Sequence, residues 1–585
     1  RDVAPSRGLG DVYKRQLIVT GLIILVVIIM GITALINKYT PTKKTEDLKE
    51  YFNISSDDEA ALIVDNELSD YKAKIIDKKI YVDYKFVHDS LNSRFYWDAN
   101  ENVLLYTTAS DIISAAADSN SYSVTKQTND FGYPIVKATS DSALIALDYV
   151  KQYSNITFKS YDDPARIVIT SKWDEIDSAT VSKSTQIRVK GGIKSPILKE
   201  VKKDDKITIL DSGDKWDKVA TEDGVIGYIK RKALSESKKT KLTNPDYEEE
   251  TFTHIKKDKD ICLAWNQVTS QSANSKVPQV ISSTKGINVM SPTWFYLNDN
   301  NGNLADIASK DYVSYCHSQG IEVWGLFSNF ENTDVDAAYV LTHTSTRTTL
   351  INQIMSAAFN YELDGVNIDF ENITEAAYGD SYIEFIRELA IKCHNNGISL
   401  SVDVTVPASF NKFFNRSDMA NFADYIVIMG YDEHYKGSDA GSVSSIPWVT
   451  EGVESTLKEV PADQIILGMP FYTRIWELTP KEDDDAVTDT EDQSKYTVAS
   501  QVYSMDAAAA QLATNNATAA LDEESGQNYA EWSVSNKLYK VWLEDSTSLE
   551  NRLKLVDDNK LAGAAFWKLG FENSSVWDTV IKYLN

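Results

Sequence analysis

The residues best suited to chemistry lie in one short segment, Asp364 to Glu371, which reads DGVNIDFE. In a β-strand successive side chains point to opposite faces, so Asn367, Asp369 and Glu371 would share one face and the apolar residues between them the other. The apolar face can pack against helices, so the polar face must point into the fold. Buried polar groups cost free energy unless they are hydrogen-bonded. This spacing therefore favours a functional site over a packed strand.

The two carboxyls of this face predict acid–base chemistry. When Asp369 is ionised, Glu371 beside it becomes harder to ionise, and its pKa rises toward that of a general acid. A hydrogen-bonded network with a purely structural role is the alternative.

Metal, thiol and disulfide chemistry have no such pattern behind them. The three cysteines, Cys262, Cys316 and Cys393, are odd in number and widely spaced. The six histidines show no HExxH or similar ligand spacing. We therefore expect no metal site, no cofactor and no disulfide scaffold.

The elements that must hold this segment are repeated strand–helix units. Apolar runs alternate with helical stretches from residue 258 onward: ICLAWNQ (261–267), INVMSPTW (287–294), IEVWGLFSNF (321–330), VNIDFE (366–371), ISLSVDV (398–404), YIVIMGYD (425–432), IILGMPFY (465–472) and AGAAFWKLG (562–570). Eight such units predict an α/β fold, a (β/α)8 TIM barrel, whose chemistry sits at the carboxyl ends of the strands. Polar or aromatic residues occur there in at least six of the eight runs.

The segment DGVNIDFE resembles the D-G-x-D-x-D-x-E signature of family 18 glycoside hydrolases, the chitinase-like enzymes. Other runs agree in order: Met429 to Asp432 resembles the family's M-x-Y-D, and Gly468 to Tyr472 and Gly563 to Trp567 resemble its last two strands. The resemblance covers about 258–585. Residues 541–545 (VWLED) are similar to the bacterial cell-wall and spore-cortex N-acetylglucosaminidases.

The resemblance implies a retaining mechanism in which the substrate's own N-acetyl group is the nucleophile, and no metal or cofactor. Glu371 would protonate the leaving oxygen and then activate water. Asp369 would hold the acetamide N–H and stabilise the oxazolinium charge, and Tyr431 would donate to the acetamide carbonyl.

Six further residues are expected to bind the sugar. Trp567 would stack on it and Asp432 would position it; the others are Asn367, Met429, Tyr472 and Arg474. A surface ion pair is the alternative for Arg474. Asn367 departs from the family pattern, which usually has Asp there, so it cannot hold a charge for Asp369 to share a proton with.

Weaker candidates have a structural alternative. Trp294, Trp324, Asn329 and Trp476 could line subsites or pack in the core. Glu544 and Trp542 fall in 473–561, which is long enough for an inserted subdomain and a pocket wall. The acidic stretch 481–492 is interpreted as a solvated loop rather than a calcium site, and His434 as structural.

The N-terminal region predicts a membrane anchor. Residues 17–36 contain no charge, which matches one helical crossing of a bilayer. Lys14 and Arg15 precede them and favour an internal N-terminus with the bulk of the chain outside. A cleaved signal peptide is the alternative. Residues 1–16 are interpreted as an expression or assembly remnant. We therefore expect a single-pass protein of the bacterial cell membrane with an extracytoplasmic catalytic domain.

Four further parts are predicted before the barrel: a polar stalk (37–75), a small α+β spacer module (76–172), an all-β module (179–236) and a linker (237–257). The stretch 95–108 resembles the N-terminal domain of copper amine oxidases, without implying a copper site. Trp216, Gly227, Tyr228 and Leu234 match the pattern of bacterial SH3-type domains, which attach enzymes to cell walls. A plain spacer barrel is the alternative.

The charge is uneven along the chain. With 59 Lys and Arg against 86 Asp and Glu the net charge is −27, which argues against a nucleic-acid binder. Residues 181–234 nevertheless carry 13 basic and 8 acidic side chains, which leaves −32 for the remainder. A basic module suits an anionic wall polymer.

Taken together, these patterns predict a membrane-anchored, envelope-facing glycosidase that cleaves β-linked N-acetylglucosamine glycans, peptidoglycan or its fragments. Two alternatives stay open. One is a chitinase acting on chitin oligomers, and the other is a catalytically inactive sugar-binding lectin on the same barrel.

Overall fold

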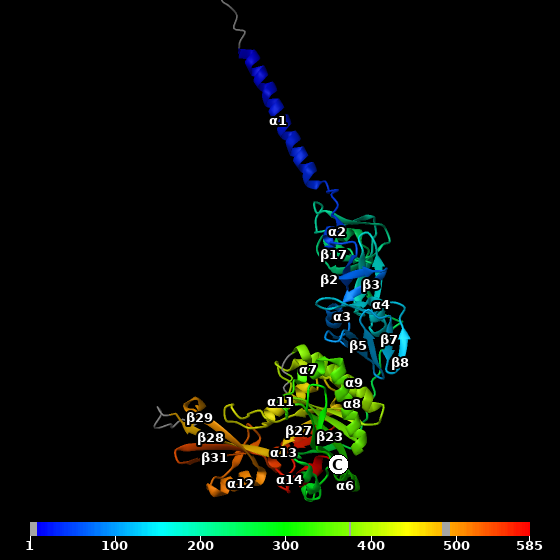
Figure 1. Cartoon of the computed structure of the whole chain (residues 1–585). Coiled ribbons are helices and arrows are strands. Elements are labelled where there is room, and N and C mark those ends of the chain that lie inside the picture. The colour runs from blue at the N-terminus through cyan, green and yellow to red at the C-terminus, as the bar shows by residue number, and fades with distance from the viewer. Residues whose placement is uncertain (1–8, 372, 374–375, 482–491, 585) are drawn as a thin grey trace, which may run out of the picture. The chain divides into compact units, whose positions relative to one another are not determined.

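The computed structural model describes residues 9–371, 373, 376–481 and 492–584 (Figure 1). The chain divides into two compact units, and each is built from two stretches of sequence. The first comprises Arg1–Ser93 and Ile135–Glu249, and the second comprises Arg94–Pro134 and Glu250–Asn585. Most of the acidic stretch predicted as a loop, residues 482–491, lies outside the described residues.

The first unit opens with the long helix α1 (Leu9–Tyr39), whose 31 residues would extend about 46 Å. It is the one helix, within the described residues, that is long and apolar enough to cross a membrane. A signal sequence near an N-terminus has the same properties, so the helix is compatible with both the anchor and the alternative.

The rest of the first unit, as far as it is described, consists of two seven-stranded sheets and three short helices. The first sheet has the order β11-β12-β1-β2-β3-β10-β9 and the second β15-β14-β18-β17-β16-β13-β19. Their elements are α2 (Leu48–Tyr51), β1 (Glu59–Val64), β2 (Glu67–Ile76), β3 (Lys79–Asp83), α3 (Tyr84–Ser90), β9 (Val136–Ala138), β10 (Ala143–Ala146), α4 (Leu147–Tyr153), β11 (Thr157–Tyr161), β12 (Arg166–Thr170), β13 (Glu175–Thr180), β14 (Thr185–Arg188), β15 (Ile197–Val201), β16 (Lys206–Asp211), β17 (Trp216–Thr221), β18 (Ile226–Lys230), the 3-10 turn η1 (Arg231–Ala233) and β19 (Lys238–Lys241).

Strands β1 and β2 lie in the range for which the sequence predicts a stalk. The run from Ala60 to Ile63 is completely buried, and β1 pairs with β2 on one side and β12 on the other. Its apolar side chains share one core with Val181, Ile187 and Val219 of the second sheet region. This part of 37–75 is therefore folded, because a short apolar run within a polar segment is enough to make a central strand.

The second unit begins with a five-stranded antiparallel meander in the described residues 95–130. Its strands are β4 (Phe95–Asp98), β5 (Val103–Thr107), β6 (Ile112–Ala116), β7 (Ser121–Val124) and β8 (Gln127–Asp130). The buried Tyr96 hydroxyl lies 2.8 Å from the Ser381 hydroxyl of helix α9 (Ala376–His394), and Thr107 donates to Glu384 of the same helix at 2.7 Å. The meander thus belongs with the barrel, whereas the sequence predicts one continuous spacer module over 76–172. Hydrogen bonds between residues almost 300 positions apart leave no trace in local periodicity.

The predicted barrel is confirmed. Eight parallel strands in the described residues follow one another in the order β20-β33-β27-β26-β25-β24-β23-β21, and pairing of β20 with β21 closes the ring. These strands are β20 (Ile261–Asn266), β21 (Val289–Leu297), β23 (Glu322–Ser328), β24 (Gly365–Asp369), β25 (Ser399–Thr405), β26 (Tyr425–Met429), β27 (Ile465–Pro470) and β33 (Gly563–Trp567). Each overlaps one of the eight runs identified in the sequence, although β21, β24 and β25 extend beyond theirs by one to three residues.

The remaining elements of this unit cover the barrel or extend its loops. They are η2 (Gln271–Lys276), α5 (Val277–Val280), β22 (Leu304–Asp306), α6 (Lys310–Ser318), α7 (Ala337–Thr342), α8 (Thr344–Tyr361), η3 (Lys412–Phe414), α10 (Arg416–Phe422), α11 (Ile446–Thr456), η4 (Ala462–Gln464), η5 (Gln493–Lys495), α13 (Ser546–Asn559) and α14 (Val576–Tyr583).

A second antiparallel sheet, of order β29-β28-β32-β31-β30 in its described parts, is inserted between β27 and α13. It contains β28 (Tyr472–Pro480), β29 (Tyr496–Ser504), α12 (Met505–Thr514), β30 (Ala520–Asp522), β31 (Gln527–Val534) and β32 (Lys537–Leu543), and Figure 1 shows it projecting from the barrel strands.

The barrel interior is filled by apolar side chains toward the amino ends of its strands. Leu263, Trp324, Tyr425 and Val427 belong to this inner cluster, and the rings of Trp324 and Tyr425 stack at 5.6 Å. A Cβ at Gly365 would lie 2.5 Å from the Trp324 ring, so only glycine fits there. Because this plug fills the bottom, the polar residues that follow on β24 lie nearer the open end.

A buried ion network on the outer helices gives a stability prediction. Arg387 on α9 is 2.9 Å from Glu384 and also pairs with Asp418 of α10, and all three side chains are buried. Arg387→Met leaves two carboxyls in a dry site without their partner, and we expect it to destabilise the protein by about 3–5 kcal/mol. Chemical denaturation of the full chain measures this loss.

Lys285→Met is the matched control, because it breaks an ion pair with Asp578 whose two side chains are about half exposed or more. We expect a loss of roughly 0–1 kcal/mol for this exposed pair. Equal losses in the two variants would contradict the prediction.

Candidate active site

A cavity of about 220 Å³ opens at the carboxyl ends of the barrel strands. Five carboxyl-bearing and several aromatic side chains share it. Its walls are formed by Trp265, Gln267, Thr293, Leu326, Phe330, Glu331, Asp369, Glu371, Asp403, Met429, Tyr431, Asp432 and Trp567. Six of the nine residues predicted to act on the substrate therefore line one cavity.

Asp369 and Glu371 stand side by side in this cavity, as the alternation of the strand requires. Asp369 is the last residue of β24 and only 7% exposed, whereas Glu371 is exposed at the cavity mouth. The Oδ1 atom of Asp369 is buried and has no hydrogen-bond partner among the described residues. An oxygen of this kind is available to a ligand that carries an N–H or O–H group.

Burial and neighbouring carboxylates raise the pKa of both groups above its ordinary value. Burial, and then the neighbouring charges of Glu371 and Glu331, raise the pKa of Asp369 to about 8. Burial, and then the charges of Asp432 and Glu331, also raise the pKa of Glu371. A carboxyl that keeps its proton near neutral pH can serve as a general acid.

Asn329, which follows β23, fixes the backbone of Glu371. The backbone N–H of Glu371 donates to Asn329 Oδ1 at 2.8 Å, and Asn329 Nδ2 donates to the Glu371 carbonyl at 2.9 Å. This reciprocal pair satisfies the backbone where the strand ends. Asn329, a weaker candidate for a subsite, thus positions the acidic residue through its backbone.

Tyr431 and Asp432 follow β26 and line the same cavity as Asp369 and Glu371. Burial, and then the nearby charges of Asp369 and Asp403, raise the pKa of Tyr431 well above its usual value, so its hydroxyl remains a donor. Asp432 has a φ of +60°, which is costly for a residue other than glycine. Tyr472 donates a hydrogen bond to its Oδ1, and Arg474 lies 3.9 Å from the same atom. These two residues stabilise the strained turn.

Tyr472 and Arg474 are therefore placed behind Asp432 and do not line the cavity. The guanidinium of Arg474 also donates to Ser500 at 3.2 Å and is about 90% buried. The sequence predicts both as direct sugar contacts, and their observed position supports Asp432 instead.

Aromatic surface comes from two tryptophans on neighbouring strands. Trp567 ends β33 and is partly exposed to the cavity, and its ring lies 6.0 Å from that of Trp265 in an edge-on arrangement. Met429, the last residue of β26, adds a polarisable wall. A sugar ring can lie against such a surface through its C–H groups.

Asn367 lies below the cavity and is completely buried. Its Oδ1 accepts hydrogen bonds from Trp265 Nε1 and Ser291 Oγ, both at 2.9 Å. Its Nδ2 donates to Ser401 Oγ at 3.1 Å and to Asp403 Oδ1 at 2.7 Å. Because all four positions of the amide are used, the structure places this residue as a support and not as a sugar contact.

The weaker tryptophan candidates are packing residues. Trp294, Trp324 and Trp476 are each fully buried, and their indole N–H groups donate to Asn274, Glu322 and the Gly441 carbonyl. His434 contacts the carbonyl of Asp439 and is structural. Glu544 is buried against Arg552 and Gln527, and Trp542 packs on Tyr529 in the inserted sheet, so neither forms a wall of this cavity.

Sequence reasoning missed Asp403, Glu331 and Trp265. Asp403 belongs to ISLSVDV, where alternation with Ser399 and Ser401 could have identified an inward-facing polar row. Trp265 is the penultimate residue of the first barrel strand and Glu331 follows the third, so both occupy the end where chemistry is expected. No local pattern distinguishes them from other loop residues.

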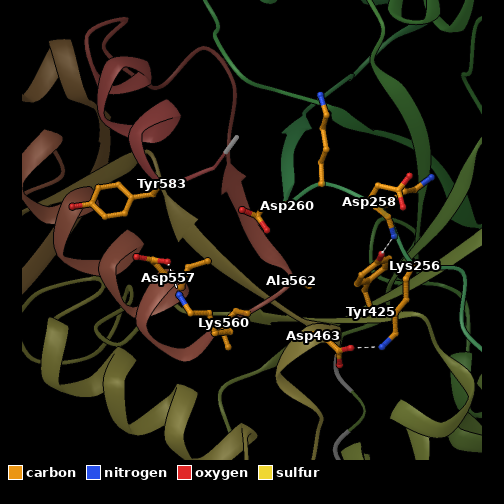
Figure 2. Close-up of a pocket in the computed structure, with 13 residues that line it drawn as sticks. Lys256, Asp258, Asp260, Tyr425, Asp463, Asp557, Lys560, Ala562 and Tyr583 are labelled. Carbon is orange, nitrogen blue, oxygen red and sulfur yellow. Dashed lines mark hydrogen bonds and ion pairs between the residues drawn. The ribbon is translucent and has the colours of Figure 1, made fainter.

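A larger cavity of about 460 Å³ lies at the opposite, amino-terminal end of the strands (Figure 2). Three of the four lysines that line it are paired with carboxylates: Lys256 with Asp463, Lys257 with Glu322 and Lys560 with Asp557. Because this face of a barrel serves stability and most of its lysines are paired, it is a poor place for chemistry.

The raised pKa of Asp369 predicts a pH-dependent stability. Between its ordinary pKa near 3.8 and the folded value of about 8, the unfolded chain has lost a proton that the folded chain retains. Stability of the wild type therefore falls as pH rises through this window. We expect Asp369→Asn to raise Tm at pH 7.5, and the difference to narrow toward pH 4. Thermal unfolding across this pH range measures it.

Glu477→Gln serves as the opposite-sign control. Hydrogen bonds from Lys537 and Tyr539 lower the pKa of Glu477, so its contribution to stability is present at neutral pH and is lost on acidification. This variant should lose Tm at pH 7.5 and approach the wild type at pH 4. A difference of the same sign in both variants would contradict the assignment.

Comparison with known proteins identifies the region that carries the cavity. The family model described as glycosyl hydrolases family 18 matches residues 327–572, under half of the chain. An uncharacterised glycosylase, YvbX, of Bacillus subtilis is 24% identical over 302 residues, which cover 48% of this chain and 81% of the relative. The cortical fragment-lytic enzyme of the same organism is 24% identical over 287 residues, covering 47% of this chain and 63% of that enzyme, just under two thirds of its length.

Among solved structures, the spore cortex-lytic enzyme SleL of Bacillus megaterium has a TM-score of 0.48 at 19% identity and covers 59% of this chain and 77% of its own. The C-terminal domain of a putative chitinase from Desulfitobacterium hafniense has a TM-score of 0.49 at 19% identity, covering 56% and 98%. Because the family match begins at residue 327, it does not test the SH3-type and amine-oxidase-like resemblances of the preceding regions, and these stay predictions. Residues 327–572, which match the model of glycosyl hydrolases family 18, include β24 and most of the cavity lining, and the protein is a glycosidase.

Proposed function

We propose that this protein cleaves β-linked N-acetylglucosamine glycans of the bacterial wall, peptidoglycan or its fragments, with retention and with the substrate's acetamide as nucleophile. The observation that carries the proposal is the placement of Asp369 and Glu371 in one cavity with Tyr431, Asp432 and Trp567. Most retaining glycosidases need two carboxyls, one as nucleophile, whereas in family 18 the substrate replaces the nucleophile.

Glu371 is the proton donor and acceptor of this proposal. Its raised pKa keeps a proton available for the glycosidic oxygen, and its exposed position at the cavity mouth makes it reachable. Once it has given up that proton, the carboxylate can take another from the attacking water, so the residue is restored after each turnover.

Asp369 and Tyr431 handle the acetamide. A carboxylate oxygen of Asp369 can accept the acetamide N–H at the cavity, and the Tyr431 hydroxyl can donate to the acetamide carbonyl. These two contacts would hold the carbonyl oxygen beneath the anomeric carbon. Among the described residues, the cavity is lined by carboxyls and by no arginine or lysine, so a positive oxazolinium charge would be stabilised there.

The remaining residues hold the sugar or support those that do. Trp567 and Met429 supply the surface for one ring, and Asp432 its polar contact, with Tyr472 and Arg474 fixing Asp432. Asn367 acts from below through its hydrogen bonds.

Wall glycan is favoured over chitin because of the other parts of the chain. The region 181–234 is basic on an otherwise acidic protein, and Lys230 lies 5.8 Å from the partly exposed Trp216 ring, an arrangement that can bind an anionic sugar polymer. Two relatives are named cortical fragment-lytic enzymes, a name that says they act on cortical fragments. Chitin oligomers remain the second substrate to be tested.

Glu371→Gln tests the catalytic assignment. We expect kcat on the preferred glycan to fall by about 10²–10⁴-fold because a positioned proton-transfer group is lost. KM should stay within a few-fold, since an amide fills the same volume. The full chain in detergent is incubated separately with purified peptidoglycan and with chitin oligomers, and mass spectrometry of the new reducing ends names the bond.

Glu451→Gln, on the exposed face of α11, is the matched control and should keep full activity. An active Glu371→Gln variant would contradict the assignment of Glu371 as the proton donor. Cleavage of chitin oligomers alone would make the protein a chitinase, and binding without any product in the wild type would favour the lectin alternative.

Residues 17–36 are proposed to remain in the membrane as an anchor. We expect the protein, expressed in a bacterium, to sediment with membranes after a high-salt wash, and tryptic fragments that include this segment to be detected by mass spectrometry. Release of a shorter protein that lacks residues 17–36 would show a cleaved signal peptide instead.

A further inference from the structure

Beneath the catalytic cavity an amide and a carboxyl from neighbouring strands form a close pair. Asn367 Nδ2 donates to Asp403 Oδ1 at 2.7 Å, while its Oδ1 is already used by Trp265 and Ser291. A carboxylate at position 367 could not donate to Asp403 in this geometry. The Asn367–Asp403 pair therefore contains one carboxyl group. In this chain that carboxyl belongs to Asp403 on β25, and position 367 in the motif of β24 carries an amide.

Asp403 is both buried and part of the cavity wall. It is 2% exposed, and it lines the cavity together with Asp369, Glu371 and Tyr431. The other titratable groups of this neighbourhood are Glu331 after β23, Asp432 after β26 and Tyr382 on α9. Among the described residues that line the cavity there is no lysine or arginine, so no cationic side chain of this lining opposes a proton on Asp403.

Asp369 has an oxygen that can accept a further hydrogen bond. Its Oδ1 is buried without a partner among the described residues, although a buried carboxylate oxygen normally accepts at least one hydrogen bond. Ile368 pairs with Val402 in the register of β24 and β25, so Asp403 stands next to Asp369 on the neighbouring strand and can donate to it when it carries a proton.

We propose that Asp403 is a positioning residue that retains a proton and donates it in a hydrogen bond to Asp369, taking over the task of the acid that position 367 lacks. This inference rests on the proposed roles of Asp369 and Glu371. Three carboxyls then share two protons: one proton is held between Asp403 and Asp369, and the other is on Glu371. Glu371 passes its proton to the leaving oxygen and regains one from water, while the proton on Asp403 stays in place.

The electrostatics agree with this geometry. Burial, and then the charge of Asp369, raise the pKa of Asp403 well above its ordinary value, although the hydrogen bond from Asn367 opposes the shift. A proton held on Asp403 lets Asp369 ionise while Glu371 keeps its own proton, which is the state that the reaction needs.

Two substitutions of Asp403 distinguish a role as hydrogen-bond donor from a role in which its side chain only fills space. Asp403→Leu removes the donor to Asp369, so we expect kcat to fall about 10²-fold and the acidic limb of the kcat/KM profile to move to higher pH, with KM within about threefold. Asp403→Asn keeps a donor for Asp369 and an acceptor for Asn367, so kcat should stay within about tenfold of the wild type.

Val404→Ala is the matched control on the same strand. Its side chain is buried toward the helices and has no ionisable group. Tm should therefore fall, while the acidic limb of the kcat/KM profile should stay at the wild-type pH. An Asp403→Leu variant with the wild-type pH profile, or one in which Asn fails as badly as Leu, would overturn the proposal.

A stability measurement decides the inference without any substrate. If Asp403 and Asp369 share one proton at pH 7.5, either single change to Asn relieves the repulsion and raises Tm, and the double variant gains less than the sum of both. Additive gains would overturn the inference. A wild type that cleaves none of the glycans would overturn the proposed function alone, because non-additive gains would still support the shared proton.

Discussion

The crowding of carboxyl groups in a confined, poorly hydrated space is the constraint on which this molecule depends. Isolated carboxylates in such a space would be strongly disfavoured, and each additional one makes the next harder to ionise. The barrel holds several of them at the carboxyl ends of its strands, so their protons are distributed by position. Asp369 is enclosed by the fold, whereas Glu371 reaches the solvent. That difference separates the group proposed to stabilise charge from the group proposed to transfer a proton.

Such crowding requires a rigid support. The apolar plug around Trp324 fills the barrel below, Asn367 joins three strands through its four hydrogen bonds, and Asn329 holds the backbone of Glu371 from the neighbouring loop. Asp432 is kept in an unfavourable backbone conformation by side chains of the inserted sheet. The inserted segment therefore contributes to the site indirectly, because it fixes one wall of the cavity.

Much of the barrel was predictable from sequence, and much of its support was not. Strand alternation places Asn367, Asp369 and Glu371 correctly, and each of the eight apolar runs is a strand, because both signals are local. The distinction between a residue that touches the cavity and one that stands behind it is not local. Tyr472, Arg474 and Asn367 have suitable chemistry near the right strand ends, yet their partners come from elsewhere in the chain. Asp403 was not predicted for the same reason, since its role depends on a residue of the neighbouring strand.

The meander formed by residues 95–130 makes the catalytic unit discontinuous in sequence. The chain enters this unit, leaves it for more than a hundred residues and then returns to build the barrel. A fragment cut at the obvious linker near residue 258 would lack the strands whose side chains satisfy Ser381, Glu384 and Thr344. Deleting the N-terminal region would likewise remove part of the catalytic unit. Evolutionary exchange of the front modules is restricted by the same topology, because no single crossover point separates them from the enzyme.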